Sequence, residues 1–196
     1  MGSSFSSSRC DVFISFRGKD TRNTFTSYLY SALRAKKIST YMDDRIKKGK
    51  EISPTITKAI KRAKLSVIVF SENYASSSWC LDELVQILEC KRKKNQIVIP
   101  IFYGVDPSDI RKQKGSYTIS SERFEGKKSK VLDKWRKALK KAANISGWDS
   151  QRVRPEQKLV EEIVKDVTKR LKIDSATMVA TGVVAGSTAA GVTLCF

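Results

Sequence analysis

Residues 11–16 read DVFISF, and three further runs of the same kind follow along the chain. They are ISTYM over residues 38–42, LSVIVF over 65–70 and IVIPIF over 97–102. Each run is apolar and β-branched rather than alternating, which is typical of parallel strands covered on both faces. The segment after the first run carries Phe25, Leu29 and Leu33 at helical spacing. Strands that alternate with helices predict right-handed βαβ units in a doubly wound α/β sheet.

The rest of the chain predicts one domain with two short tails. We expect residues 1–8 to be disordered, residues 9–172 to form the domain and residues 173–196 to form a C-terminal tail. Residues 175–196 contain no charged side chain, follow a basic stretch and are long enough to span a bilayer. A weak membrane anchor and a free tail both remain open interpretations. The N-terminus also fits a myristoylation template, with Gly2 and Ser6 in place and Cys10 available for acylation.

Composition limits the chemistry. The 196 residues include 38 Lys and Arg against 20 Asp and Glu, a formal net charge of +18, and no histidine. The absence of histidine excludes Ser-His-Asp and Cys-His nucleophiles and HExxH zinc sites. Acid–base chemistry must then use carboxylates, Lys, Tyr or Cys. We predict no metal site and no tightly bound cofactor.

The positive charge suggests an anionic partner. It is concentrated in residues 34–64 and residues 127–141. Solvated helix faces explain both blocks most simply. The alternative is a positive rim around an anionic-ligand pocket, or a surface for self-association.

The four cysteines form no CxxC pair and no regular spacing. They are Cys10, Cys80, Cys90 and Cys195. With no secretory signal at the N-terminus, we expect reduced thiols in a cytoplasmic protein.

Three loops are expected to meet where a doubly wound sheet binds its ligands, beyond the carboxyl ends of the strands. They span residues 17–22, 43–54 and 71–83. The first offers the guanidinium groups of Arg17 and Arg22 to a phosphate. The second is rich in lysine. The third places a carboxylate in the first turn of a helix capped by a serine. Such a carboxylate usually only complements the helix dipole, but the combination favours a nucleotide ligand with a carboxylate near its ribose.

Several long motifs closely resemble a plant Toll/interleukin receptor (TIR) domain. The resemblance extends from about Arg9 to Leu171. It is carried by DVFISFRGKDTRNTFTSYLYSAL (11–33), YMDDRIKKGKEISPTITKAI (41–60), VIVFSENYASSSWCLDEL (67–84), IPIFYGVDPSDIRKQKGSY (99–117), WRKALKKAANISGWDS (135–150) and EEIVKDVTKRL (161–171). It implies a flavodoxin-like fold with five parallel strands. It also suggests a TIR-only protein or a truncated form of a TIR-type disease resistance protein.

The resemblance further implies an NAD⁺ glycohydrolase that cleaves the nicotinamide–ribose bond and self-associates in immune and cell-death signalling. Its catalytic glutamate corresponds to Glu83 in the W-C-L-x-E-L motif. NAD⁺ or NADP⁺ would be the substrate. The implied substrate-binding residues are Arg17, Gly18, Lys19, Asp20, Thr21, Arg22, Gly49 and Trp79, and the implied self-association residues are Ser27, Tyr28 and Gly115.

Three departures from the family pattern bear on these expectations. Lys19 stands where the first motif usually has an acid, which alters the charge beside the phosphates. Tyr28 stands where the first helix usually has histidine, which alters a self-association contact. Residues 118–125 differ from the usual helix pattern.

The alternative function is a non-catalytic adaptor that binds other TIR domains, including those of immune receptors. Nucleic acid is a third, less favoured partner. The membrane is a further one, through the tail or through acylation of the N-terminus.

Overall fold

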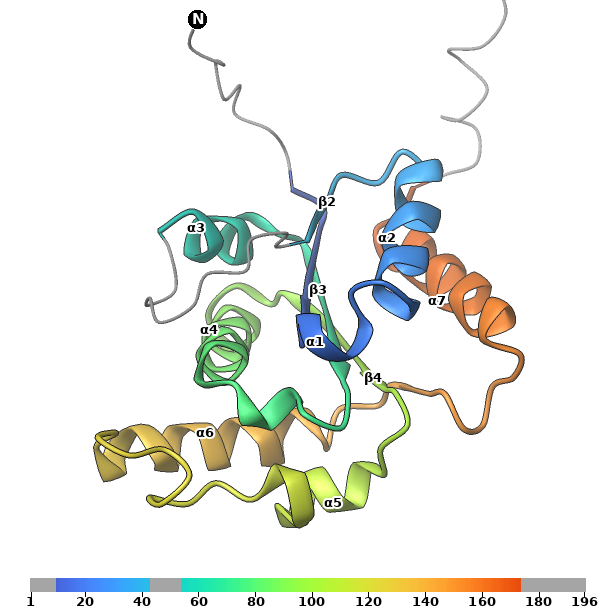
Figure 1. Ribbon diagram of the computed structural model, residues 1–196. Coiled ribbons are helices and arrows are strands. Elements are labelled where there is room, and N and C mark those ends of the chain that lie inside the picture. The colour runs from blue at the N-terminus through green and yellow to red at the C-terminus, as the bar shows by residue number, and fades with distance from the viewer. Residues whose placement is uncertain (1–9, 43–53, 174–196) are drawn as a thin grey trace, which may run out of the picture.

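The computed structural model describes residues 10–42 and 54–173 and contains one five-stranded, all-parallel sheet (Figure 1). The strand order is β2-β1-β3-β4-β5. The strands are β1 (Val12–Phe16), β2 (Thr40–Met42), β3 (Leu65–Phe70), β4 (Ile97–Phe102) and β5 (Trp148–Asp149). The doubly wound α/β fold and the four strands predicted from apolar runs are confirmed, with β1 and β2 slightly shorter than predicted.

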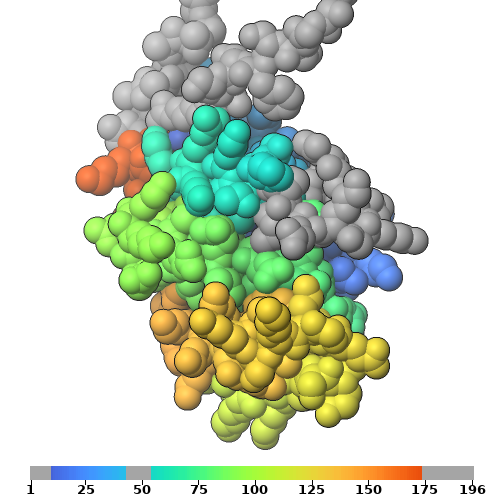
Figure 2. Space-filling model, turned by 90° about the vertical axis from the view of Figure 1, so that its left-hand side faces the viewer, coloured from blue at the N-terminus to red at the C-terminus, as the bar shows by residue number. Residues whose placement is uncertain are grey.

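Helices connect the strands and cover both faces of the sheet. They are α1 (Gly18–Thr21), α2 (Phe25–Ala35), α3 (Pro54–Arg62), α4 (Ser78–Lys94), α5 (Pro107–Lys112), α6 (Ser129–Ala142) and α7 (Glu156–Arg170), with single 3₁₀ turns η1 (Tyr74–Ser76) and η2 (Gly115–Tyr117). Helices α2 and α7 pack together on one face. On the other face α3, α4 and α6 lie one beside the next, as Figure 2 shows.

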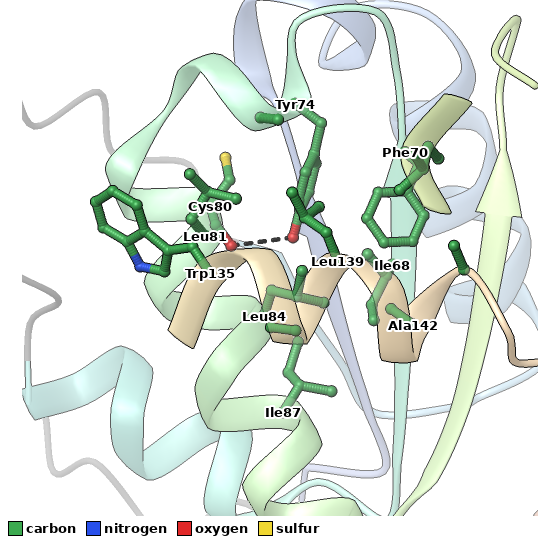
Figure 3. Packing of buried hydrophobic residues seen from close by; sticks show 14 of the residues in the cluster. Ile68, Phe70, Tyr74, Cys80, Leu81, Leu84, Ile87, Trp135, Leu139 and Ala142 are labelled. Carbon is green, nitrogen blue, oxygen red and sulfur yellow. Dashed lines mark hydrogen bonds between the residues drawn. The ribbon is translucent and has the colours of Figure 1, made fainter. Parts of the chain in front are cut away.

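The two faces of the sheet bury two separate hydrophobic clusters. Alternate residues of β1 point to opposite sides, so Phe13 belongs to the cluster under α3, α4 and α6, and Ile14 to the cluster under α2 and α7. Figure 3 shows part of the first cluster, which includes Trp135 and Leu139 of α6 and Leu81 and Leu84 of α4. Burial on both faces explains why the strand sequences read as unbroken apolar runs.

The fifth strand was not located by any apolar run, because it contains only two residues. It pairs Trp148 with Ile101 and Asp149 with Phe102. The preceding Gly147 packs directly against β4. A Cβ atom at Gly147 would lie 2.1 Å from the carbonyl oxygen of Pro100, so only glycine allows this approach.

The amino ends of the strands are held by a buried glutamine. Gln96 is 5% exposed, and its amide nitrogen donates to the carbonyl oxygens of Ile60 and Ala63, each at 2.7 Å. Its side-chain oxygen accepts from Ser66 at 3.3 Å. Gln96 therefore supplies donors to the C-terminal end of α3, where backbone carbonyls lack helical partners.

Several predictions fall outside the described residues. These are the myristoylation template at Gly2, the loop containing Gly49 and the uncharged segment 175–196. Among residues 10–42 and 54–173, none of the helices has the length and apolar character needed to cross a bilayer.

Candidate functional site

The candidate site lies at the carboxyl edge of the sheet, between β1 and β3. Helix α2, which follows β1, and helix α4, which follows β3, cover opposite faces. The winding of the sheet therefore reverses between these two strands, which is where open α/β sheets bind their ligands.

Glu83 is at the centre of this site and is 4% exposed. One carboxylate oxygen accepts a hydrogen bond from the Ser15 hydroxyl at 2.7 Å. The other accepts from the indole nitrogen of Trp79 at 2.8 Å. Trp79 precedes Glu83 by one helical turn, so the two side chains lie on the same face of α4. A buried carboxylate is tolerated here because both of its oxygens are bonded.

Helix α4 begins at the position that the sequence indicated. The hydroxyl of Ser77 accepts from the backbone nitrogen of Cys80 at 3.3 Å, which is an N-cap interaction. The prediction that a serine caps this helix is thus confirmed, and the cap is Ser77. The cap fixes the first turn, which contains Trp79. Glu83 is the sixth residue of α4 and lies in the second turn, and the first turn contains no acidic side chain, so the prediction of a carboxylate in the first turn is wrong.

A buried tyrosine extends the network beneath Glu83. The Tyr74 hydroxyl lies 2.9 Å from the Ser15 hydroxyl and donates to the carbonyl oxygen of Cys80 at 3.1 Å (Figure 3). Burial, together with nearby Cys80 and Glu83, raises the pKa of Tyr74 well above its ordinary value. Tyr74 therefore stays protonated and acts as a fixed donor.

Ser15 and Tyr74 were not among the predicted site residues. Ser15 is the polar residue inside the apolar run DVFISF, and a fully buried hydroxyl needs a partner. That break in the run was the available signal. Tyr74 had no comparable signal, because an aromatic residue in a loop is as often part of the hydrophobic core as of a functional site.

Arg17 contributes an unsatisfied donor beside this network. Its Nε atom is buried and has no hydrogen-bond partner among the residues that the structure describes. The positive charge of Arg17 is close enough to Cys80 to oppose the rise of the Cys80 pKa, which burial and then Glu83 bring to about 12. A buried N–H group without a partner is costly, so an incoming anionic group would be stabilised there.

Gly18 and Arg22 form a second cationic feature in the first loop. The Arg22 guanidinium carbon lies 5.0 Å from the centre of the Phe16 ring. A Cβ atom at Gly18 would approach an Arg22 guanidinium nitrogen to 2.8 Å. The missing side chain at Gly18 thus leaves room for Arg22 to fold back over Phe16.

The other predicted residues of this loop have different environments. Asp20 accepts from the Ser71 hydroxyl at 2.6 Å and from the backbone nitrogen of Asn73 at 2.8 Å, so it ties the loop after β1 to the loop after β3. Thr21 is buried, and its hydroxyl lies 2.7 Å from that of Thr26. Lys19 is exposed to solvent. Asp20 and Thr21 therefore hold the loop in place, whereas Lys19 is free to face a ligand.

The predicted self-association residues do not form one cluster with Glu83. Ser27 donates its hydroxyl to the Arg22 carbonyl at the start of α2. Tyr28 is 62% exposed and is the one exposed large hydrophobic residue in the described part of the chain. Gly115 is exposed at the start of η2 with a φ of 54°, which favours glycine.

The described ends of the first charge block do not border the site. Residues 34–37 and 61–64 lie at the ends of α2 and α3 and lead into β2 and β3, so they lie at the opposite, amino edge. Residues 43–53 lie outside the described part, and a positive rim contributed by that segment stays a prediction. Within residues 10–42 and 54–173, no group of three or more Cys, Asp or Glu side chains could hold a metal ion.

Comparison with known proteins places this geometry in a family. The family model described as TIR domain matches residues 10–185. The chain is 49% identical over 162 residues to Disease resistance protein RPV1 of Vitis rotundifolia, which covers 83% of this chain and 12% of that protein. It is 48% identical over 177 residues to TMV resistance protein N of Nicotiana glutinosa, which covers 87% of this chain and 16% of that protein. The chain thus spans less than a fifth of the length of these plant disease resistance proteins.

Solved structures agree with the sequence comparison. The TIR domains of the activated Roq1 resistosome, which directly recognises the pathogen effector XopQ, match with a TM-score of 0.73 and 51% identity over 80% of this chain and 98% of that chain. The RPS4 and RRS1 TIR domain heterodimer matches with a TM-score of 0.50 and 27% identity over 81% of this chain and 96% of that chain. Both are assemblies of TIR domains.

Proposed function

This chain belongs to the TIR domain family, and from that membership we propose that it is an NAD⁺ glycohydrolase of the plant TIR type, acting in immune defence. The observation that carries the proposal is the buried Glu83 carboxylate, held by Ser15 and Trp79 at the point where the sheet changes its direction of winding. The site offers a fixed negative charge beside a cationic loop.

The reaction fits a protein without histidine. The bond between the ribose C1′ and the nicotinamide nitrogen breaks, and both bonding electrons go to the nitrogen, which becomes neutral. No acid is needed to protonate this leaving group. Water then adds to C1′ and releases one proton, giving ADP-ribose and nicotinamide. Cyclic ADP-ribose-type products form instead when a group of the substrate itself attacks C1′.

Glu83 supplies the charge that this reaction needs. Positive charge develops on the ribose as the bond breaks, and a carboxylate stabilises it directly or by orienting a ribose hydroxyl. Ser15 and Trp79 keep the carboxylate in one orientation, so little reorganisation is needed when the substrate arrives.

The first loop supplies positive charge for the phosphates of the substrate. The Arg17 Nε atom is a buried donor with no acceptor among the described residues, and Arg22 of the same loop lies over the Phe16 ring. Exposed Lys19 adds a cation where the family usually has an acid, which favours a substrate with more negative charge. NADP⁺ is therefore to be tested beside NAD⁺.

Nicotinamide release by purified protein tests the proposal, with Glu83→Gln as the central variant. A glutamine side chain can still accept from Trp79 and place its amide nitrogen toward Ser15, so we expect the variant to fold. We expect its turnover to fall about a thousandfold, because the negative charge is lost. The matched control is Glu89→Gln on the same helix, where Glu89 is 46% exposed and pairs with Lys93. The proposal fails if folded Glu83→Gln releases nicotinamide as fast as the wild type.

A second candidate function is a TIR adaptor without enzymatic activity. It is favoured by one observation, the exposed ring of Tyr28 on α2. Measuring turnover and oligomeric state over a range of protein concentrations separates the two functions. Association without nicotinamide release at any concentration would support the adaptor, whereas turnover that rises steeply with concentration would support a self-associating enzyme.

A further inference from the structure

Four helices of the fold end in short segments of nearly continuous positive charge. The sequences are RAKK at residues 34–37, KRAK at 61–64, KRKK at 91–94 and KRLK at 169–172. They lie at the ends of α2, α3, α4 and α7, and every Lys and Arg in them is exposed to solvent. One cation in the last turn is enough to complement a helix dipole. These segments carry three or four basic residues each, so the dipole does not account for them.

The topology gathers the four segments at one end of the molecule. Helices α2, α3 and α4 each return the chain to the amino end of the next strand. Helix α7 starts at the carboxyl edge, where Glu156 bonds to Tyr103 at 2.6 Å, and therefore also ends toward the amino edge. We call residues 34–37, 61–64, 91–94 and 169–172 the basic pole.

Contacts within the structure link parts of the basic pole. The Lys94 ammonium donates to the backbone carbonyl of Lys61 at 3.3 Å, which joins the ends of α4 and α3. Lys64 pairs with Asp11 at 3.1 Å, and the same carboxylate accepts from the backbone nitrogen of Ser39 at 3.4 Å. Asp11 therefore connects the end of α3 with the segment that follows α2.

Acidic side chains cancel only part of this charge. Asp11 pairs with Lys64, Glu89 pairs with Lys93 at 3.8 Å, and Asp166 pairs with Arg170 at 2.7 Å. The basic pole contains thirteen Lys and Arg residues against these three acids, so it keeps a large positive charge.

Both ends of the described chain leave from this pole. Cys10 lies two residues before β1, and Ile173 directly follows the last basic segment, so both lie at the amino edge (Figure 1). In the sequence, Asp174 follows Ile173, and residues 175–196 beyond it carry no charge. Basic clusters next to an apolar stretch are typical of segments that contact anionic lipid.

We propose that the basic pole docks the folded domain on an anionic lipid surface. Lysine predominates in all four segments, and lysine acts as a hydrated point charge suited to a diffuse anionic surface. Arginine, by contrast, is preferred where nucleic acid is recognised through paired hydrogen bonds. The charges are also spread over four helix ends on both faces of the sheet. This arrangement leaves the site around Glu83, at the opposite edge, facing away from the lipid.

Vesicle co-sedimentation of the full chain tests the proposal. The probes are phosphatidylcholine vesicles with and without phosphatidylserine, and the measured quantity is the ratio of partitioning onto the two. We expect strong preference for the anionic vesicles, which falls as salt is raised. Because any binding by the uncharged tail contributes to both arms, the ratio reports the charged surface alone.

Two sets of charge reversals locate the binding surface. The pole variant combines Lys36→Glu, Lys61→Glu, Lys91→Glu and Lys169→Glu, one from each segment. The control combines Lys130→Glu, Lys134→Glu, Lys137→Glu and Lys141→Glu on α6, which lies next to α5 and away from the chain ends (Figure 1). Both change the net charge equally. We expect the ratio of partitioning onto anionic and neutral vesicles to fall at least about tenfold in the pole variant and to stay close to the wild-type value in the control.

Several results would overturn the proposal. These are equal partitioning onto both kinds of vesicle, an equal loss in the two variants, and salt-sensitive binding of the basic pole to duplex DNA without any preference for anionic vesicles. Circular dichroism checks that each variant folds. If the pole variant does not, the corresponding Lys→Gln changes replace it, with the same Lys→Gln changes in the control.

Discussion

The carboxyl and amino edges belong to the same sheet, yet their polar groups differ. Those at the carboxyl edge are buried and fixed by hydrogen bonds, whereas most of those at the amino edge are basic and exposed. At the carboxyl edge, Glu83, Ser15 and Tyr74 are buried, and the Ser15 hydroxyl lies within hydrogen-bond distance of both Glu83 and Tyr74. At the amino edge, the basic pole is exposed, and the buried Gln96 beside it bonds to backbone carbonyls. Net charge alone points to the amino edge, whereas the proposed reaction needs groups that are fixed and desolvated, and these lie at the carboxyl edge.

The comparison implies that a buried polar residue at the amino edge serves stability rather than turnover. Gln96→Leu removes both donors from the Ile60 and Ala63 carbonyls while keeping a similar volume. We expect the free energy of unfolding to fall by about 2–4 kcal/mol, because buried acceptors are left unbonded. Turnover per folded molecule should not change. Urea denaturation followed by nicotinamide release on the folded fraction measures both.

Gln157→Leu is the matched control for this change. Gln157 is exposed on α7 and bonds to Glu161 at 2.9 Å. We expect its effect on stability to stay within about 0.5 kcal/mol. A Gln96→Leu protein that keeps its stability but loses turnover would remove the distinction between the two edges.

Two buried serines provide a sharper comparison of the edges. Ser15 near the end of β1 donates to Glu83, whereas Ser66 near the start of β3 donates to Gln96, and both are 0% exposed. We expect Ser15→Ala to lower kcat about ten- to a hundredfold, or about 1.4–2.7 kcal/mol, with little change in KM, because it leaves the Glu83 carboxylate less well oriented.

Ser66→Ala should leave both kinetic constants unchanged. Steady-state kinetics of nicotinamide release distinguishes the two variants. Equal losses of kcat in the two serine variants would mean that Ser15 acts only through packing, and a Ser15→Thr variant that restores kcat would support its positioning of Glu83.

We expect alkaline pH to lower the stability of the folded protein through one buried thiol at the carboxyl edge, that of Cys80. Burial, and next the charge of Glu83, raise the pKa of Cys80 to about 12 from an ordinary value of 9.0. The folded protein therefore keeps this proton where the unfolded chain loses it. The resulting contribution to stability is complete below about pH 9 and is lost as pH rises through about 12, at up to about 1.4 kcal/mol per pH unit.

Cys80→Ala removes this contribution and should flatten the fall in stability above pH 9. Thermal unfolding at pH 7 gives the packing cost of the substitution, and unfolding at about pH 10.5 adds the proton linkage. The wild type and the variant should differ less at the higher pH than at pH 7. A difference that is the same at both values would show that Cys80 titrates normally.

Four of the strands and the start of α4 were predictable from the sequence, because apolar runs and helix caps are local signals. The run LSVIVF at 65–70 forms β3 as predicted, and the cap at Ser77 fixed the start of α4. Strand β5 carried no such signal, since two residues cannot show a period. Its position depends on Gly147 fitting against Pro100, a contact between segments far apart in the chain.

The candidate site was predictable only in part, for the same physical reason. Trp79 and Glu83 are one helical turn apart, so their hydrogen bond follows from the spacing. The contact of Glu83 with Ser15 joins residues on different elements and required the fold. The role of Asp20 in bridging two loops, through Ser71 and Asn73, was likewise hidden from the sequence.

The outer strands have a consequence for how copies of this protein can meet. Strand β5 contains two residues, and as far as the described residues run, β2 contains three. Next to β5, Pro100 of β4 has no N–H group. On the β5 side of the sheet, the short outer strand and Pro100 disfavour the addition of a foreign strand. We therefore expect copies that meet on this side to do so through helix surfaces rather than by extending the sheet.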